Sequence, residues 1–158
     1  MKRINLKKNR LVELKLWNKL TYKEQPHFIG SWNIENENLC SEIINFFDKN
    51  EILQKKGLIG SGIDQTKKKT TDITVKPSDL KDYKYKCFNN YIDELYKCFI
   101  DYQHQWPFIN IIKDVDIGSF NVQKYEKGDH FSQIHTERFN LQTSNRLFAW
   151  MTYLNNVE

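Results

Sequence analysis

The stretch Tyr125-Glu-Lys-Gly-Asp-His-Phe-Ser-Gln-Ile-His-Thr-Glu137 determines our prediction for this chain. It places His135 two residues before Glu137, shortly after a glycine-containing turn. In an extended strand, side chains at positions i and i+2 point to the same face, with Cβ atoms about 6–7 Å apart. A neutral imidazole nitrogen and a carboxylate oxygen on one face can bind the same metal ion. The pattern therefore predicts two metal ligands, although a His-x-Glu pair alone is common on solvated strands.

The residues on either side of this stretch predict a sheet of three strands. Residues 116–124 form the first strand and residues 131–137 the second, and a polar loop over 138–144 follows. Residues 145–155 are apolar at almost every position, which is typical of a strand that is buried on both faces.

The alternation of side chains within these strands supports a common interior. Tyr125, His135 and Glu137 share one parity and can face the same side, and Tyr153 can face that side from the third strand. His130 has the opposite parity to His135, so we expect it to be a turn or surface residue.

Two helices are predicted before the sheet. The first covers residues 39–54, with an apolar stripe at helical spacing and Asn38 as its N-cap. The second runs from residue 80 to 105 after an N-cap at Ser78, and its aromatic stripe indicates a core face. Between them, residues 64–76 are polar and predict a mobile loop leading into a short edge strand.

Composition favours one domain or most of one. The chain has 158 residues, of which 39% are hydrophobic, enough to build a core. We assign residues 1–26 to a basic N-terminal extension and residues 27–158 to the domain. The net charge of +4 comes mainly from lysine, and arginine, which most often reads bases and grips phosphates, is scarce. We therefore expect no nucleic-acid partner, and we interpret the lysine run at 67–69 as a solvated loop.

The three cysteines and the hydropathy pattern predict the cellular setting. An odd count without a Cys-x-x-Cys pair argues against a disulfide scaffold and favours a reducing, cytoplasmic location. No run of about 18 apolar residues could cross a membrane, so no membrane partner is expected. Glu13 and Lys15 interrupt the segment that a signal peptide would need to be apolar.

Taken together, the motif order resembles the first half of a 2-oxoglutarate- and Fe(II)-dependent oxygenase domain of the prolyl-4-hydroxylase type. The likeness is carried by Asn121-Val-Gln-Lys-Tyr125, Gly128, Phe131, His135-x-Glu137 and the later run Arg146-Leu-Phe-Ala-Trp-Met-Thr-Tyr-Leu-Asn155. It covers residues 116–155 specifically and the preceding helices only by their order. The resemblance implies an α+β fold, with N-terminal helices packed on a double-stranded β-helix (jelly-roll) sheet.

The same resemblance implies roles for four residues. His135 and Glu137 would be metal ligands, and Tyr125 and Tyr153 would bind the co-substrate 2-oxoglutarate. No catalytic residue beyond the metal ligands is implied. The cofactor would be Fe(II), with ascorbate as a further candidate, and the reaction would hydroxylate a C–H bond of a peptide or small-molecule substrate by using dioxygen.

Two departures from the family pattern affect this interpretation. The carboxylate is Glu137, where aspartate is commoner. The sequence also ends at Glu158 without the Gly-Gly-x-Thr segment, the second metal histidine and the basic co-substrate anchor that the family would carry. We therefore expect a domain without its C-terminal part, and a chain that is inactive by itself. The alternatives are a non-catalytic remnant or interaction module, a homodimer that supplies the missing strands, and a basic nucleic-acid-binding domain.

Overall fold

The computed structural model describes residues 28–34, 36–112 and 114–156, which fall into two compact units. Among the described residues, one unit combines those from 28 to 37 with those from 88 to 116, and the other combines residues 38–87 with residues 117–156. The predicted basic extension over residues 1–26 lies outside the described part of the chain. Within that part, no helix has the length and apolar character needed to span a membrane.

The first unit contains most of helix α2 (Lys86–Gln105) and the 3-10 helix η5 (Pro107–Ile111). An aromatic cluster joins the end of α2 to the segment before α1. The Tyr102 hydroxyl donates to the carbonyl of Phe28 at 2.6 Å, and Trp32 Nε1 donates to Asp101 Oδ2 at 2.8 Å. The Phe28 ring also lies 4.8 Å from the ring of Trp106. The aromatic stripe that predicted this helix therefore has a packing role.

The second unit begins at Asn38, the second residue of helix α1 (Glu37–Lys49). It continues into the 3-10 helix η2 (Glu51–Leu53). The apolar stripe predicted for this helix is confirmed, because all four of its residues are buried. Together with two buried residues of strand β3 they form the core of this unit: Leu39, Ile43, Phe46, Phe47, Ile73 and Val75.

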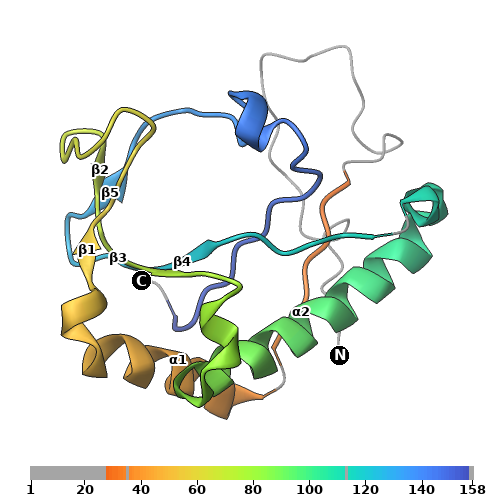
Figure 1. Cartoon of the computed structure of the whole chain (residues 1–158), viewed down its shortest axis with the longest axis horizontal. Coiled ribbons are helices and arrows are strands. Elements are labelled where there is room, and N and C mark those ends of the chain that lie inside the picture. The colour runs from red at the N-terminus through yellow and green to blue at the C-terminus, as the bar shows by residue number, and fades with distance from the viewer. Residues whose placement is uncertain (1–27, 35, 113, 157–158) are drawn as a thin grey trace. The chain divides into compact units, whose positions relative to one another are not determined.

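Two antiparallel sheets complete the second unit. Strands β1 (Lys55–Lys56), β3 (Thr71–Val75) and β4 (Phe120–Lys124) lie in the order β1-β3-β4, as Figure 1 shows. A smaller ladder pairs β2 (Lys68–Lys69) with β5 (His130–Phe131). The predicted α+β class is confirmed, and the described strands form no closed barrel.

Both predicted helices differ from the structure at their ends. Helix α1 begins before Asn38, so that residue is not the N-cap, and its last carbonyls are bonded by the side chains of Asn50 and Gln54. Helix α2 begins at residue 86 instead of 80 because two 3-10 turns precede it, η3 (Asp79–Lys81) and η4 (Tyr83–Tyr85). Asp82 accepts a bond from the Lys84 N–H at 2.9 Å, and such local side-chain bonds compete with a continuous α-helix.

The polar segment 64–76 was predicted to lead into a short edge strand; the strand is present as β3, but its predicted edge position was wrong. Strand β3 is the central strand, because Asp72 pairs with Lys55 of β1 on one side and with Gln123 of β4 on the other. The interpretation of the lysine run as a solvated loop was also wrong at its middle residue, since Lys68 is only 4% exposed.

The second and third predicted strands are not formed as expected. Strand β5 ends at Phe131, and residues 132–136 are irregular. Residues 145–155 contain no strand, and several apolar side chains there are exposed, among them Leu147, Met151 and Tyr153. An apolar run forms a strand only where a neighbouring strand offers hydrogen bonds, and no described strand pairs with this run, although the Trp150 ring lies 6.1 Å from the ring of Phe120 in β4.

Candidate functional site

A tight turn connects β4 to β5 and leads into the predicted metal-binding pair. The Glu126 N–H donates to Asp129 Oδ2 at 2.9 Å, and the Asp129 N–H donates back to the Glu126 carbonyl at 2.8 Å. Gly128 has φ = +87°, a conformation that glycine adopts with little strain. The Asp129 carboxylate also pairs with Lys69 at 2.9 Å. These bonds, first the one from Glu126, hold the pKa of Asp129 below its ordinary value and fix β5 against β2.

The ring of His135 is oriented by two contacts within its own segment. It stacks on the Phe131 ring, with centroids 4.7 Å apart and an interplanar angle of 24°. Its Nδ1 atom lies 3.2 Å from the carbonyl oxygen of Gln133. A carbonyl oxygen can only accept, so this bond requires the proton to be on Nδ1. The lone pair of the neutral ring is then on Nε2, the atom that would bind a metal.

His135 and Glu137 converge as the sequence predicted. His135 Nε2 lies 3.4 Å from Glu137 Oε1, and both side chains are 49% exposed. The other oxygen of Glu137 accepts from Arg146 Nη1 at 2.9 Å, which orients the carboxylate. Consider two ligand atoms that each lie about 2.1 Å from the same ion. If the ligand–metal–ligand angle is between that of an octahedral and that of a tetrahedral site, the two atoms are about 3.0–3.4 Å apart. The spacing of these two donors therefore fits a shared divalent cation.

The pair also has a reason to attract a positive charge. A neutral Nε2 and a carboxylate oxygen are both acceptors, so their approach is stabilised by a proton on the ring or by a cation bound to both. Among the described residues, no three side chains of the His, Cys, Asp and Glu types gather as a metal site. His130 Nε2 lies instead 3.1 Å from the carbonyl oxygen of Thr66. The described residues thus supply two donors of a possible triad.

The two predicted co-substrate tyrosines lie near a different cluster. The Tyr125 hydroxyl is 3.4 Å from Gln123 Oε1, and its pKa is raised first by desolvation and then by the charge of Asp72 and the phenol of Tyr153. Within the described residues, no hydrogen bond or ion pair joins either tyrosine to His135 or Glu137.

A buried ion pair lies at the centre of that cluster. Lys68 Nζ is 2.7 Å from Asp72 Oδ2, and the two side chains are 4% and 8% exposed. Thr70 Oγ1 donates to Asp72 Oδ1 at 2.7 Å, and Gln123 Nε2 donates to Asp72 Oδ2 at 3.1 Å. The carboxylate therefore accepts three bonds. A buried charge destabilises the fold unless it is paired and hydrogen-bonded in this way.

The ion pair links the two groups of predicted site residues. Lys68 Nζ lies 5.6 Å from the centroid of the Phe131 ring, whose other contact is the stacked ring of His135. On the other side, Asp72 is bonded through Gln123 to Tyr125. A continuous set of contacts thus runs from His135 to Tyr125.

Sequence reasoning missed Lys68 and Asp72 because both lie in a run that looks polar and solvated. The alternation of side chains along an extended segment could have identified these two residues. Lys68, Thr70 and Asp72 alternate with the intervening residues, so in an extended segment they share one face. Ile73 and Val75 then occupy the opposite face and are buried.

Comparison of the chain with protein-family models, with curated proteins and with solved structures finds no match.

Proposed function

We propose that this chain provides the Fe(II)- and 2-oxoglutarate-binding part of an oxygenase domain, and that His135 and Glu137 are two of the metal ligands. The single observation that carries the proposal is the 3.4 Å approach of His135 Nε2 to Glu137 Oε1. The jelly-roll architecture, the cytoplasmic setting and the prolyl-4-hydroxylase-like character belong to the same proposal and rest on the resemblance of the motifs.

The residues around His135 and Glu137 have defined roles in this proposal. Gln133 holds His135 in the tautomer with a lone pair on Nε2, and Arg146 orients Glu137. Phe131 covers one face of the imidazole ring and keeps it from rotating. Bound Fe(II), with 2-oxoglutarate as co-substrate, would supply the activation of dioxygen for hydroxylation of a C–H bond. A facial triad needs a third protein ligand, which the described residues do not place beside the pair.

Tyr125 and Tyr153 are proposed to bind the co-substrate carboxylates. The hydroxyl of a tyrosine is protonated at neutral pH, so Tyr125 can donate a hydrogen bond. Its present acceptor, Gln123 Oε1, is 3.4 Å away, which is a long and weak hydrogen bond. A carboxylate oxygen is a stronger acceptor and would compete for this hydroxyl.

The experiment that tests co-substrate binding is a calorimetric titration of the anaerobic, Fe(II)-loaded chain with 2-oxoglutarate. Tyr153→Phe and Tyr125→Phe should each weaken binding without changing the affinity for the metal. Tyr83→Phe is the matched control, because the Tyr83 side chain is also exposed and lies in the turn η4, away from the cluster. Equal binding by all four proteins would contradict the roles assigned to Tyr125 and Tyr153.

A second candidate function, a non-catalytic interaction module, is favoured by the exposure of apolar side chains after β5. Ile134 is 99% exposed, Leu141 is 90% exposed and Met151 is 76% exposed. Exposed apolar side chains mark a binding surface where they form one contiguous patch. Sedimentation of the wild type and of Ile134→Ser and Met151→Ser variants would test this. Self-association that falls in the variants would favour the module, and monomers throughout would count against a homodimer.

A further inference from the structure

A groove of about 370 Å³ lies on the second unit, beside the exposed face of the three-stranded sheet. Its volume falls within the range of small-molecule sites. Strand β1 and the turn before it form one side, and strands β3 and β4 form the floor. The lining combines apolar side chains with lysines and with hydrogen-bonding groups: Ile52, Leu53, Lys55, Lys56, Leu58, Asp72, Thr74, Lys76, Asp79, Tyr85 and Asn121.

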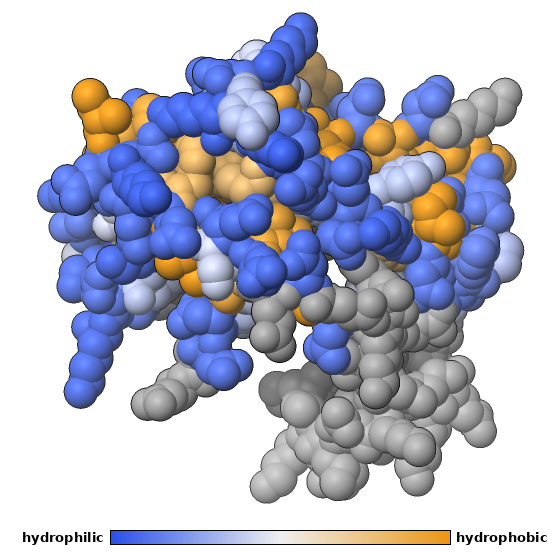
Figure 2. Space-filling view, turned by 90° about the horizontal axis from the view of Figure 1, so that it is seen from below, coloured by the Kyte–Doolittle hydropathy of each residue, from blue (hydrophilic) through white to orange (hydrophobic). Residues whose placement is uncertain are grey.

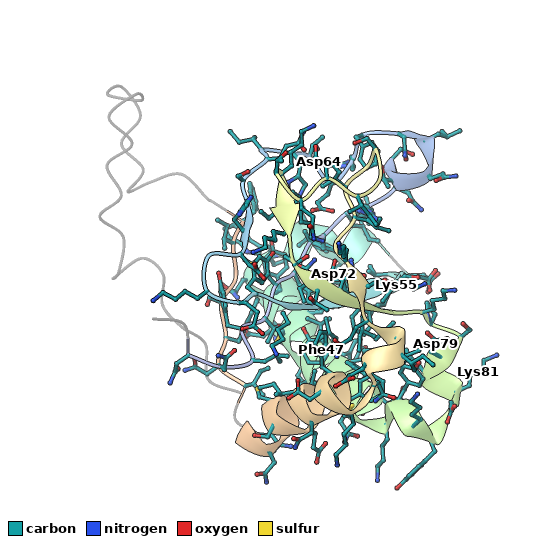
Figure 3. All side chains as sticks on the ribbon, turned by 90° about the vertical axis from the view of Figure 1, so that its left-hand side faces the viewer. Phe47, Lys55, Asp64, Asp72, Asp79 and Lys81 are labelled. Atoms are coloured by element: carbon teal, nitrogen blue, oxygen red, sulfur yellow. The ribbon has the colours of Figure 1, made fainter. Side chains whose placement is uncertain are left out.

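Three lysines give this groove a positive character. Lys55, Lys56 and Lys76 make no ion pair with any described residue, whereas Lys67, Lys68, Lys69, Lys97 and Lys124 each pair with a carboxylate. Figure 3 shows Lys55 next to Asp72 on the sheet, as expected from their register.

The two acidic residues of the groove are already engaged. Asp72 is bonded to Lys68, Thr70 and Gln123, and its charge is balanced by the Lys68 ammonium group. Asp79 accepts from the backbone N–H of Lys76 at 2.9 Å. Among the lining residues, the lysines therefore outnumber the one carboxylate, that of Asp79, that has no ion-pair partner among the described residues.

Hydrogen-bond donors complete the lining. The Thr74 hydroxyl donates to Asn121 Oδ1 at 2.8 Å, which orients the side-chain amide of Asn121. Tyr85 contributes a phenol from the opposite side. Burial, and then the charges of Asp79 and Asp82, raise the pKa of this phenol above its ordinary value. These groups suit the oxygens of an anionic head group.

We propose that this groove binds a small organic anion, with its phosphate or carboxylate group held by Lys55 and Lys76, which share one face of the sheet, and its apolar body lying against Leu58 and the adjacent residues Ile52 and Leu53. The site is separate from the metal-binding pair, so it stands whether or not the chain is an oxygenase.

Lysines on an edge strand also discourage edge-to-edge association of sheets. That role would account for Lys55 and Lys56, which lie on the edge strand β1. It would not account for Lys76, which follows the central strand β3, or for the apolar lining. The blue hydrophilic areas in Figure 2 show that charged and polar side chains are widespread on the described surface, so the test must separate this groove from diffuse charge.

The test is a titration of the ¹⁵N-labelled chain with phenyl phosphate, benzoate and inorganic phosphate, followed by amide chemical shifts. We expect saturable shifts at Thr74 and Asn121 with phenyl phosphate, benzoate or both, and the tighter of the two identifies the preferred head group. Removing one close charge at the surface should weaken binding about fivefold, so Lys55→Ala and Lys76→Ala should each have this effect.

Two control variants keep the result specific. Lys81→Ala removes an exposed lysine from the turn η3, which does not line the groove, and should leave the affinity unchanged. Leu58→Ser should weaken phenyl phosphate or benzoate but leave inorganic phosphate as it was. The proposal would be overturned by the absence of saturable binding, by an equal loss in Lys81→Ala, or by unchanged affinities in Leu58→Ser.

Discussion

Replacement of Gly57 by alanine should destabilise the second unit, because this glycine leaves room for the buried ion pair. Its N–H donates to the Thr70 carbonyl at 2.9 Å, which brings the two backbones close together. A Cβ atom at position 57 would lie 2.1 Å from Thr70 Oγ1 and 2.9 Å from Lys68 Cε. Neither distance is compatible with van der Waals contact, so both side chains would have to move.

The magnitude follows from three contributions. Overpacking in a well-packed site costs about 1–3 kcal/mol. Displacement of Thr70 would also weaken its hydrogen bond to Asp72, and a bond to a charged group is worth about 1.5–3 kcal/mol. The lower entropy of the unfolded chain offsets about 0.4–1 kcal/mol, since the φ angle of Gly57 is not positive. We therefore expect a net loss of about 1.5–5.5 kcal/mol, with the upper end reached only if the Thr70 hydrogen bond is lost completely.

The assay is urea unfolding followed by far-ultraviolet circular dichroism, with Gly118→Ala as the matched control. A Cβ atom at position 118 would meet no heavy atom within 4 Å, so that variant should be neutral or slightly stabilised. On a Thr70→Ala background, Gly57→Ala should cost less, because the atom nearest the new methyl group is gone. Equal free energies of unfolding for Gly57→Ala and Gly118→Ala would refute the reasoning.

Three further predictions follow from the same contacts. Lys68→Met should cost about 3–5 kcal/mol in urea unfolding because it leaves the Asp72 charge buried and unpaired, and the double variant Lys68→Met/Asp72→Leu should cost less than the single one. An equal or larger cost in the double variant would contradict this. The pKa of Asp129 is lowered on folding, so its contribution to stability is present above its ordinary value of 3.8 and is lost as the pH falls through the lower folded-state value. Asp129→Asn should remove this part of the acid dependence, and an unchanged pH profile would refute the assignment. Arg146→Gln should weaken the affinity for a divalent cation without abolishing it, because Arg146 only orients Glu137. Calorimetry with Co(II) would measure the change. An unaltered affinity would contradict the role of Arg146.

The parts of the fold that local patterns determine were predictable from the sequence. The apolar stripe of α1 is buried at all four positions because helical periodicity places those side chains on one face. The start of α2 was not predictable from the stripe alone. Asp79 and Asp82 bond nearby backbone N–H groups, and two 3-10 turns form where periodicity alone would have continued the helix.

The parts that depend on distant partners were not predictable. Lys68 looks solvated in the sequence, and only its pairing with Asp72 and its position beside Phe131 make its burial tolerable. Residues 145–155 have the composition of a buried strand, but no described strand forms hydrogen-bonded pairs with them. The convergence of His135 and Glu137 was predicted from strand parity, yet the segment is irregular. There the stacking on Phe131 and the bonds to Gln133 and Arg146 orient the pair in place of a strand.

The most direct test of the account is the binding of Fe(II) to the chain under anaerobic conditions, measured by calorimetry for the wild type and three variants. We predict one Fe(II) per chain in the wild type, with binding lost in His135→Ala and in Glu137→Ala. His130→Ala is the matched control, because its ring faces the Thr66 carbonyl, and it should bind as the wild type does. Unchanged binding in His135→Ala, or an equal loss in His130→Ala, would contradict the claim that His135 and Glu137 form a metal-binding pair.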